Sequence, residues 1–143
     1  MPINGLSVGR DITLDLITPN GPLRLNVITK FTSKPDVVDE KIKPLNRAPI
    51  HLRFPDGWSG SFEIERDSDA LDRHFARAED DYYLGVNESP CTITETIIEP
   101  NDAISQYRYE GVLLKLEDAG EWEDTKSVKQ KLSFVASRRK KVS

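Results

Sequence analysis

The C-terminal third of the chain, residues 105–137, constrains the fold most. Its apolar side chains recur at every second position in two runs, one over 107–116 and one over 128–136. This alternation is the pattern of a half-buried β-strand. The residues between the runs, 117–126, are polar apart from Trp122. We therefore predict a long antiparallel hairpin that packs and pairs but carries no catalytic set.

Gly111 interrupts the alternation in the first of these strands. Tyr107 and Tyr109 stand at odd positions, whereas Val112 and Leu114 stand at even ones. A phase shift of one residue at a glycine is typical of a β-bulge, which bends the strand. The hairpin is thus predicted to be bent rather than flat.

The remaining strands are predicted from shorter runs of the same alternation. Pro19-Asn20-Gly21-Pro22 and Pro55-Asp56-Gly57-Trp58 have the composition of tight turns. They predict two hairpins, the first formed by strands 10–18 and 23–32 and the second by strands 50–54 and 59–66. A further strand is predicted over 91–99.

One helix is predicted over 67–85, where the apolar period changes. Leu71, Phe75, Ala78 and Tyr82 follow the spacing of a single helical stripe. Asp67 or Ser68 suits the N-cap, Asp69 suits the positive end of the helix dipole, and Gly85 suits the C′ position. Since the stripe is narrow, the helix is expected on the outside of the sheets.

Together these elements predict a mainly β fold in a single domain spanning 1–143. The expected architecture is two packed antiparallel sheets, a β-sandwich or barrel, with one flanking helix and a long extended loop. No apolar run is long enough to span a membrane, and the N-terminus lacks the features of a signal peptide. The single cysteine, Cys91, excludes an intrachain disulfide and fits a reducing compartment.

The long extended loop is predicted over 33–49, which contains three prolines and seven charged residues. So little apolar material predicts either a mobile surface loop or an arm that reaches a neighbouring subunit. The basic tail, 138–143, has two interpretations as well. It is either a solvated, disordered end or a segment that docks on an acidic partner surface.

Residue types that perform chemistry are present, but not in productive patterns. His51, His74 and Cys91 lack the spacing of metal ligands. Both histidines are expected at the surface, and Cys91 is expected to be buried because it alternates in phase with Ile93. The sequence contains neither a nucleophile elbow nor a phosphate-binding loop, and its paired acids, such as Asp80-Asp81, fall on the polar face of the helix. We predict no catalytic, cofactor or metal site, and therefore no enzyme.

The closing segment, 107–116 followed by 131–137, resembles the tail tube proteins of contractile-tailed bacteriophages. The likeness extends to the order of the elements, with a long charged segment after the second strand, one helix and a closing hairpin. It covers most of the chain, but it is a pattern of strands and turns rather than of chemical residues. The resemblance implies hexameric rings that stack into a hollow tube, with the sheets of six subunits forming a barrel around the lumen.

The same resemblance implies partners and contacts. The tube would bind a tail sheath protein, baseplate and tail terminator proteins, a tape measure protein and, transiently, DNA in the lumen, in a virion tail assembled in the host cytoplasm. Residues 33–49 would reach the adjacent ring. The expected inter-ring contacts are then the charged residues of that segment: Lys34, Asp36, Asp39, Glu40, Lys41, Lys43 and Arg47. Candidates for the lumen surface are Asp11, Thr13, Asp15, Arg108 and Glu110.

Other functions are open at this point. The tube could belong to a type VI secretion system or to a phage-tail-like bacteriocin. A small β-barrel module that binds a ligand or a peptide is a second class, and it predicts a stable monomer with an apolar cavity. An enzyme would need a catalytic set assembled from His51, His74 or the carboxylates.

Overall fold

The computed structural model describes residues 3–6, 11–19, 21–23, 28–67 and 69–142. Within these ranges the chain forms eight β-strands and one α-helix. The strands are β1 (Ile12–Thr18), β2 (Gly21–Leu23), β3 (Ile28–Ile42), β4 (Ile50–Glu65), β5 (Cys91–Ile98), β6 (Ile104–Asp118), β7 (Lys129–Ala136) and β8 (Arg138–Lys141), and the helix is α1 (Ala70–Tyr83). The prediction of a mainly β chain with one helix is confirmed.

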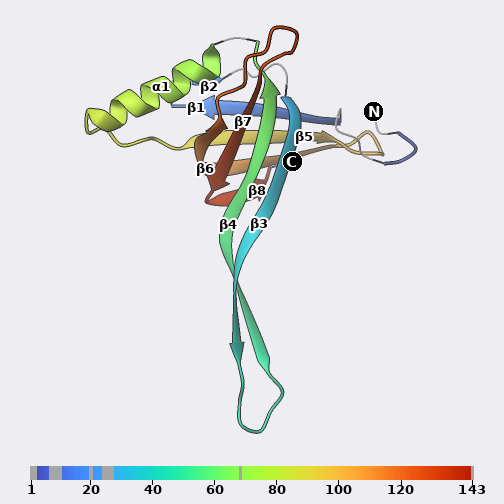
Figure 1. Ribbon diagram of the computed structural model, residues 1–143. Coiled ribbons are helices and arrows are strands. Elements are labelled where there is room, and N and C mark those ends of the chain that lie inside the picture. Colours follow the sequence, from blue (N-terminus) through green and yellow to red (C-terminus); the bar gives the residue numbers. More distant parts are fainter. Residues whose placement is uncertain (1–2, 7–10, 20, 24–27, 68, 143) are drawn as a thin grey trace.

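The strands pair antiparallel in one sheet, in the order β2-β1-β5-β6-β7-β4-β3, with β8 added beside β6. The first half of β6 pairs with β5 and β8, whereas its second half pairs with β7. In Figure 1, β1 and β5 run across the molecule while β3, β4 and β7 run steeply down it. The two sheets expected from the sequence are therefore two halves of one open sheet, joined through β6.

Gly111 lies where β6 passes from one half of the sheet to the other. Ile93 pairs with Tyr109, and Cys91 pairs with Val112, so β6 contains one extra residue between these two pairs. Gly111 has a φ of +65°, which residues with a Cβ rarely adopt. The predicted bulge is confirmed, and it produces the bend.

The core fills the space between the two halves of the sheet. Leu16, Ile93 and Tyr109 come from one half, and Leu132 and Phe134 come from the other. The rings of Tyr109 and Phe134 meet edge to face, with centroids 5.6 Å apart. Side chains of β7 alternate between buried and more exposed positions, as expected for a strand with one face on the core.

The N-cap residue of α1 is Asp69 rather than Asp67, one of the two predicted N-caps. The other, Ser68, lies outside the described residues. Its C-terminal end follows the prediction, because Gly85 at C′ has a φ of +80°. The Gly85 and Val86 amides donate to the carbonyls of Tyr82 and Asp81, which is a Schellman motif. Of the predicted stripe, Leu71 is buried and Phe75 packs against the core, but Tyr82 is exposed.

The predicted hairpin over 50–66 is wrong, because β4 continues through the expected turn. Pro35 pairs with Trp58 and Val37 pairs with Pro55, so β4 has one extra residue between these pairs. Gly57, with a φ of +92°, lies within this interval. The Pro-Asp-Gly sequence therefore forms a bulge rather than a reversal of the chain.

The first predicted hairpin is confirmed only where it turns. β1 pairs with β2 through Thr18 and Gly21. The return strand predicted over 23–32 divides, because residues from Ile28 onward belong to β3 and pair with β4. Residues 24–27 of the predicted strand lie outside the described residues.

Candidate assembly interface

The arm, residues 36–57, is a two-stranded ribbon that extends far beyond the rest of the molecule (Figure 1). Within the described residues, β7 pairs with β4 over 58–65, whereas residues 50–55 of β4 pair with β3 alone. The segment predicted as an irregular loop over 33–49 is therefore mostly strand, and only 43–49 connects the two strands. The extended arm exists, but as a hairpin.

The base of the arm is held to the sheet at the bulge. The Ser59 hydroxyl donates to the Asp36 carboxylate across 3.2 Å. A Cβ on Gly57 would lie 2.6 Å from the carbonyl oxygen of Ala136 at the end of β7. Because real Cβ atoms do not approach a backbone oxygen so closely, only glycine allows β4 to pass β7 at this point.

The charged residues predicted as contacts are distributed along the whole arm. Lys34 lies on the part of β3 inside the sheet, opposite Ser59. Asp39 forms an ion pair with Arg53, with 2.8 Å between Oδ1 and Nε. The other predicted contacts lie at the base, along the ribbon and in the tip loop: Asp36, Glu40, Lys41, Lys43 and Arg47. None of them is buried in the free subunit.

The apolar face of the arm was not predicted as a contact. Val38 lies opposite Phe54, and Ile42 lies opposite Ile50, so these side chains share one face of the ribbon. Val38 and Phe54 are each 50% exposed. We define the apolar face as Val38, Ile42, Ile50, Leu52 and Phe54. In the sequence, the alternation of Ile50, Leu52 and Phe54 indicated a strand. It did not indicate that these side chains would be exposed.

A buried polar cluster joins the two halves of the sheet. Tyr109 is fully buried, and its hydroxyl donates to the Glu95 carboxylate across 2.8 Å. The Ser33 hydroxyl of β3 lies 3.1 Å from the Tyr109 hydroxyl oxygen. Burial raises the pKa of Tyr109 to about 12. Glu95, which interrupts the apolar pattern of β5, is thus a hydrogen-bonded partner inside the fold.

The basic tail completes this cluster. Residues 138–141 form β8, and Arg139 lies opposite Tyr109. The Arg139 guanidinium lies 3.6 Å from the ring centroid of Tyr107, and 3.8 Å separates its Nη2 from Oε2 of Glu95. The interpretation of the tail as a disordered end is therefore wrong, because its second residue stacks on an aromatic ring and faces a buried carboxylate.

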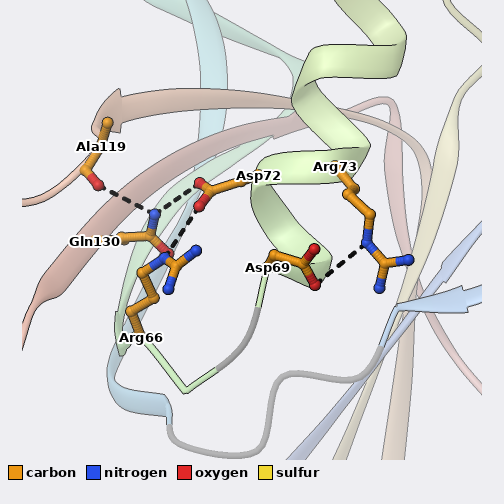
Figure 2. Close-up of polar contacts among 6 residues, drawn as sticks. All are labelled: Arg66, Asp69, Asp72, Arg73, Ala119 and Gln130. Atoms are coloured by element: carbon orange, nitrogen blue, oxygen red, sulfur yellow. Dashed lines mark hydrogen bonds and ion pairs between the residues drawn. The ribbon is translucent and has the colours of Figure 1, made fainter.

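The helix is attached to the sheet through Asp72 (Figure 2). Its carboxylate accepts from Arg66 Nε at 3.0 Å and from Gln130 Nε2 at 2.9 Å. Gln130 also donates to the carbonyl of Ala119 across 3.1 Å. These bonds connect α1, the end of β4, β7 and the β6–β7 loop. The helix is therefore bonded to the body along its first turn, whereas the arm beyond its base pairs only strand to strand.

The candidate chemical residues do not form a site. His51 is exposed on the arm, as predicted, and Cys91 is buried, where burial raises the pKa of its thiol. His74 is half-buried against Phe75 rather than at the surface, and burial lowers its pKa. Among the described residues, no group of three acidic, histidine or cysteine side chains is placed to hold a metal ion. Within the same ranges, no helix has the length and apolar character needed to cross a membrane.

The candidates for a lumen surface are not equivalent. Asp11 is 2% exposed, so it cannot contribute to an open surface of the subunit. Thr13 and Asp15 are exposed on β1, and Arg108 forms an ion pair of 3.5 Å with Glu110 on β6. Thr13 and Asp15 follow the predicted alternation of β1. Asp11 precedes the first residue of β1 and is buried instead.

No model of a known protein family matches the sequence, and no curated protein is similar to it. The fold, in contrast, matches chains from solved structures of contractile particles. A chain of the anti-feeding prophage tube-terminating cap has a TM-score of 0.67 at 5% identity, covering 100% of this chain and 95% of that chain. A chain of the anti-feeding prophage baseplate, a six-fold symmetrised structure, has a TM-score of 0.60 at 8% identity. The match covers 98% of this chain and 97% of that chain.

A third likeness is to a chain of the sheath–tube complex of PVC, an extracellular contractile injection system. It has a TM-score of 0.58 at 6% identity and covers 91% of this chain and 88% of that chain. At such identities the likeness concerns the fold, and it extends over nearly the whole of each chain. The chain therefore has a fold found in components of contractile injection systems. The resemblance to contractile-tail tube proteins is confirmed at this level, and these neighbours are structural parts of particles.

Proposed function

We propose that the chain is a structural protomer of a contractile-tail tube. Six copies form a ring, rings stack into a hollow tube inside a contractile sheath, and the lumen conducts the genome. The protein acts by assembly and not by catalysis. Its further partners are the sheath, baseplate, terminator and tape measure proteins, and DNA passes through the tube in the virion tail.

The observation that carries this proposal is the arm. A two-stranded ribbon is marginally stable in water unless another surface covers it. Here the ribbon projects from the body with five apolar side chains exposed on one face. Such a surface fits a protein that completes its packing in an assembly. The six-fold symmetry of the anti-feeding prophage baseplate supports rings of six.

The experiment is negative-stain electron microscopy of the purified protein over a range of concentrations and salt. Rings with a central hole, or hollow tubes of constant width, are the expected result. A uniform population of small monomers under all conditions would contradict the proposal. It would favour the binding-module alternative, which needs a ligand cavity inside the fold.

Whether the tube belongs to a phage tail or to an injection particle without a genome is a separate question. We propose the phage tail, because the closing hairpin resembles tail tube proteins of phages. Extraction of nucleic acid from complete particles, isolated with any head that is attached to the tail, tests it. DNA protected from nuclease is expected, whereas particles that protect protein cargo alone would favour the bacteriocin or type VI type of tube.

A further inference from the structure

The distal part of the arm combines apolar and basic residues. Residues 41–53 include four basic side chains, and no acidic residue occurs between them. These are Lys41, Lys43, Arg47 and Arg53. Among the described residues, the first three form no ion pair, whereas Arg53 is paired with Asp39. Leu45 at the tip is fully exposed. The tip of the arm thus presents an uncovered apolar side chain next to positive charge. On the ribbon itself, Glu40 lies opposite Leu52 on the apolar face, and Lys41 lies on the other face.

The opposite combination occurs at the C-terminal end of α1. We call this surface the helix corner and define it as Tyr82, Tyr83, Leu84 and Val86. The two tyrosine rings contact each other edge to face, with centroids 5.4 Å apart. Tyr82, Tyr83 and Leu84 are 74%, 76% and 79% exposed. Large apolar side chains rarely gather at such exposure without a partner.

Negative charge predominates around the helix corner, although Arg77 of the preceding turn lines the same hollow as Asp81, Val86 and Glu88. Residues 79–88 include four acidic side chains and no basic one, the reverse of the arm. The acids are Glu79, Asp80, Asp81 and Glu88. None of them forms an ion pair with another described residue. The helix corner and the distal arm therefore match in both properties, apolar against apolar and acidic against basic.

The two surfaces cannot meet within one molecule. In Figure 1 the arm projects down from the body, whereas α1 lies at the top and its end leading to β5 projects past the edge of the sheet. A contact between them must join two copies. Because the surfaces differ, the contact is head-to-tail, and a head-to-tail contact can be repeated indefinitely.

We propose that the distal arm of one copy docks on the helix corner of a second copy. This inference rests on the proposed function, since it assigns the surface that receives the arm. The apolar face covers the helix corner. Lys43 and Arg47 of the tip loop, with Lys41 beside them on the other face of the ribbon, supply the positive charge that meets the surrounding acids. The docked arm loses its water-exposed apolar surface, and the ribbon gains the packing that a two-stranded hairpin lacks.

The test is a charge swap. One variant reverses the arm with Lys41→Glu, Lys43→Glu and Arg47→Glu, and another reverses the corner with Glu79→Lys, Asp80→Lys and Asp81→Lys. Each alone is expected to abolish tubes at concentrations where the unmodified protein forms them, because like charges then face each other. A protein carrying both reversals is expected to form tubes again. The matched control reverses three exposed acids of the β6–β7 loop, Glu121, Glu123 and Asp124, and is expected to keep tubes.

Cysteine cross-linking provides a second readout that does not depend on tubes. Leu45→Cys and Tyr83→Cys proteins, one of them tagged, are mixed and oxidised, and a disulfide-linked heterodimer is expected. Trp122→Cys replaces Tyr83→Cys as the control, because Trp122 is 71% exposed and Tyr83 is 76% exposed. That mixture is expected to give no heterodimer above the background of Cys91, which is buried.

The outcomes separate this inference from the proposed function. If the corner reversal leaves tubes intact, or the double reversal does not restore them, the helix corner is not the receiving surface and the inference is overturned, while the tube function stands. If the unmodified protein forms neither rings nor tubes, the proposed function itself fails. In that case a heterodimer between Leu45→Cys and Tyr83→Cys would still support the pairing of the two surfaces.

Discussion

The body of the sheet and the arm are made of the same strands but are stabilised differently. In the body, β4 pairs on both sides and places Phe62 and Ile64 in the core. In the arm, the same strand has one partner and leaves Phe54 half exposed. The alternation of apolar residues is similar in both, yet only the body has a second layer to cover it. The body is therefore stabilised by its own core, whereas the arm has no packing layer within the chain.

The polar contacts differ in the same way. The body buries the hydroxyl of Tyr109 against Glu95, where hydrogen bonds are strong and the loss of one partner is costly. The arm carries the Asp39–Arg53 ion pair, whose side chains are 61% and 72% exposed. Exposed pairs contribute little, because water and salt screen them. Substitutions in the two regions should thus separate effects on folding from effects on assembly.

The largest contrast is expected from truncating one phenylalanine in each region. Phe134→Ala removes a ring that is 2% exposed and stacks on Phe31 at 5.7 Å. It should lower the free energy of unfolding by about 3–5 kcal/mol, as large-to-small core substitutions do. Phe54→Ala in the arm should change it by less than about 0.5 kcal/mol in the free subunit. Urea unfolding of both variants measures this, and similar losses would mean that the arm belongs to the folding core.

A smaller loss is expected when Glu95 loses its cation. Arg139→Ala leaves a carboxylate that is 6% exposed without the guanidinium beside it, and it removes the stacking on Tyr107. We expect a loss of about 2–3 kcal/mol, below the full cost of breaking a buried pair because Arg139 is partly exposed. Lys140→Ala on the exposed side of β8 is the control and should be neutral within about 0.5 kcal/mol. Equal effects would show that β8 contributes through its backbone alone.

Tyr109→Phe should lower the free energy of unfolding by about 1–1.5 kcal/mol at neutral pH, because Glu95 loses a hydrogen bond. The pH dependence has a definite sign. Burial raises the pKa of this phenol from 10.0 to about 12, so the folded state favours the neutral form. The resulting stability is complete below pH 10 and is lost as the pH rises toward 12. Urea unfolding of both proteins from about pH 9 upward should show the difference between their free energies of unfolding becoming smaller. The exposed control, Tyr83→Phe, should have the same free energy of unfolding as the unmodified protein.

The parts of the fold that the sequence predicted correctly are those in which local pattern and burial agree. The closing hairpin, the bulge at Gly111 and the end of α1 at Gly85 each follow from a few neighbouring residues. Glu95 could not be interpreted in this way. It interrupts an alternating strand. Its partners Tyr109 and Arg139 come close to it only because β6 pairs with β5 and β8 pairs with β6.

The arm was mispredicted because its sequence has the composition of a loop. Pro35 lies in β3, which is the last strand in the order of the sheet, and an edge strand tolerates a residue without an N–H. The Pro-Asp-Gly sequence before Trp58 indicated a turn, but pairing with β3 makes it a bulge. The candidate contacts were chosen by charge, so the apolar face was overlooked. An exposed strand and a buried strand have the same alternation, and only the positions of the other strands distinguish them.

The smallest effect on folding, and the largest on assembly, is expected from shortening the arm. Residues 38–54 are replaced by Asn-Gly, which joins Val37 to its pairing partner Pro55 through a tight turn. The free energy of unfolding of the subunit should change by less than about 1 kcal/mol, because the removed residues are exposed. Sedimentation and electron microscopy should then show folded subunits that no longer form long tubes. Tube growth equal to that of the full chain would sink the assignment of the arm to contacts between rings, whereas loss of cooperative unfolding would place the arm within the body.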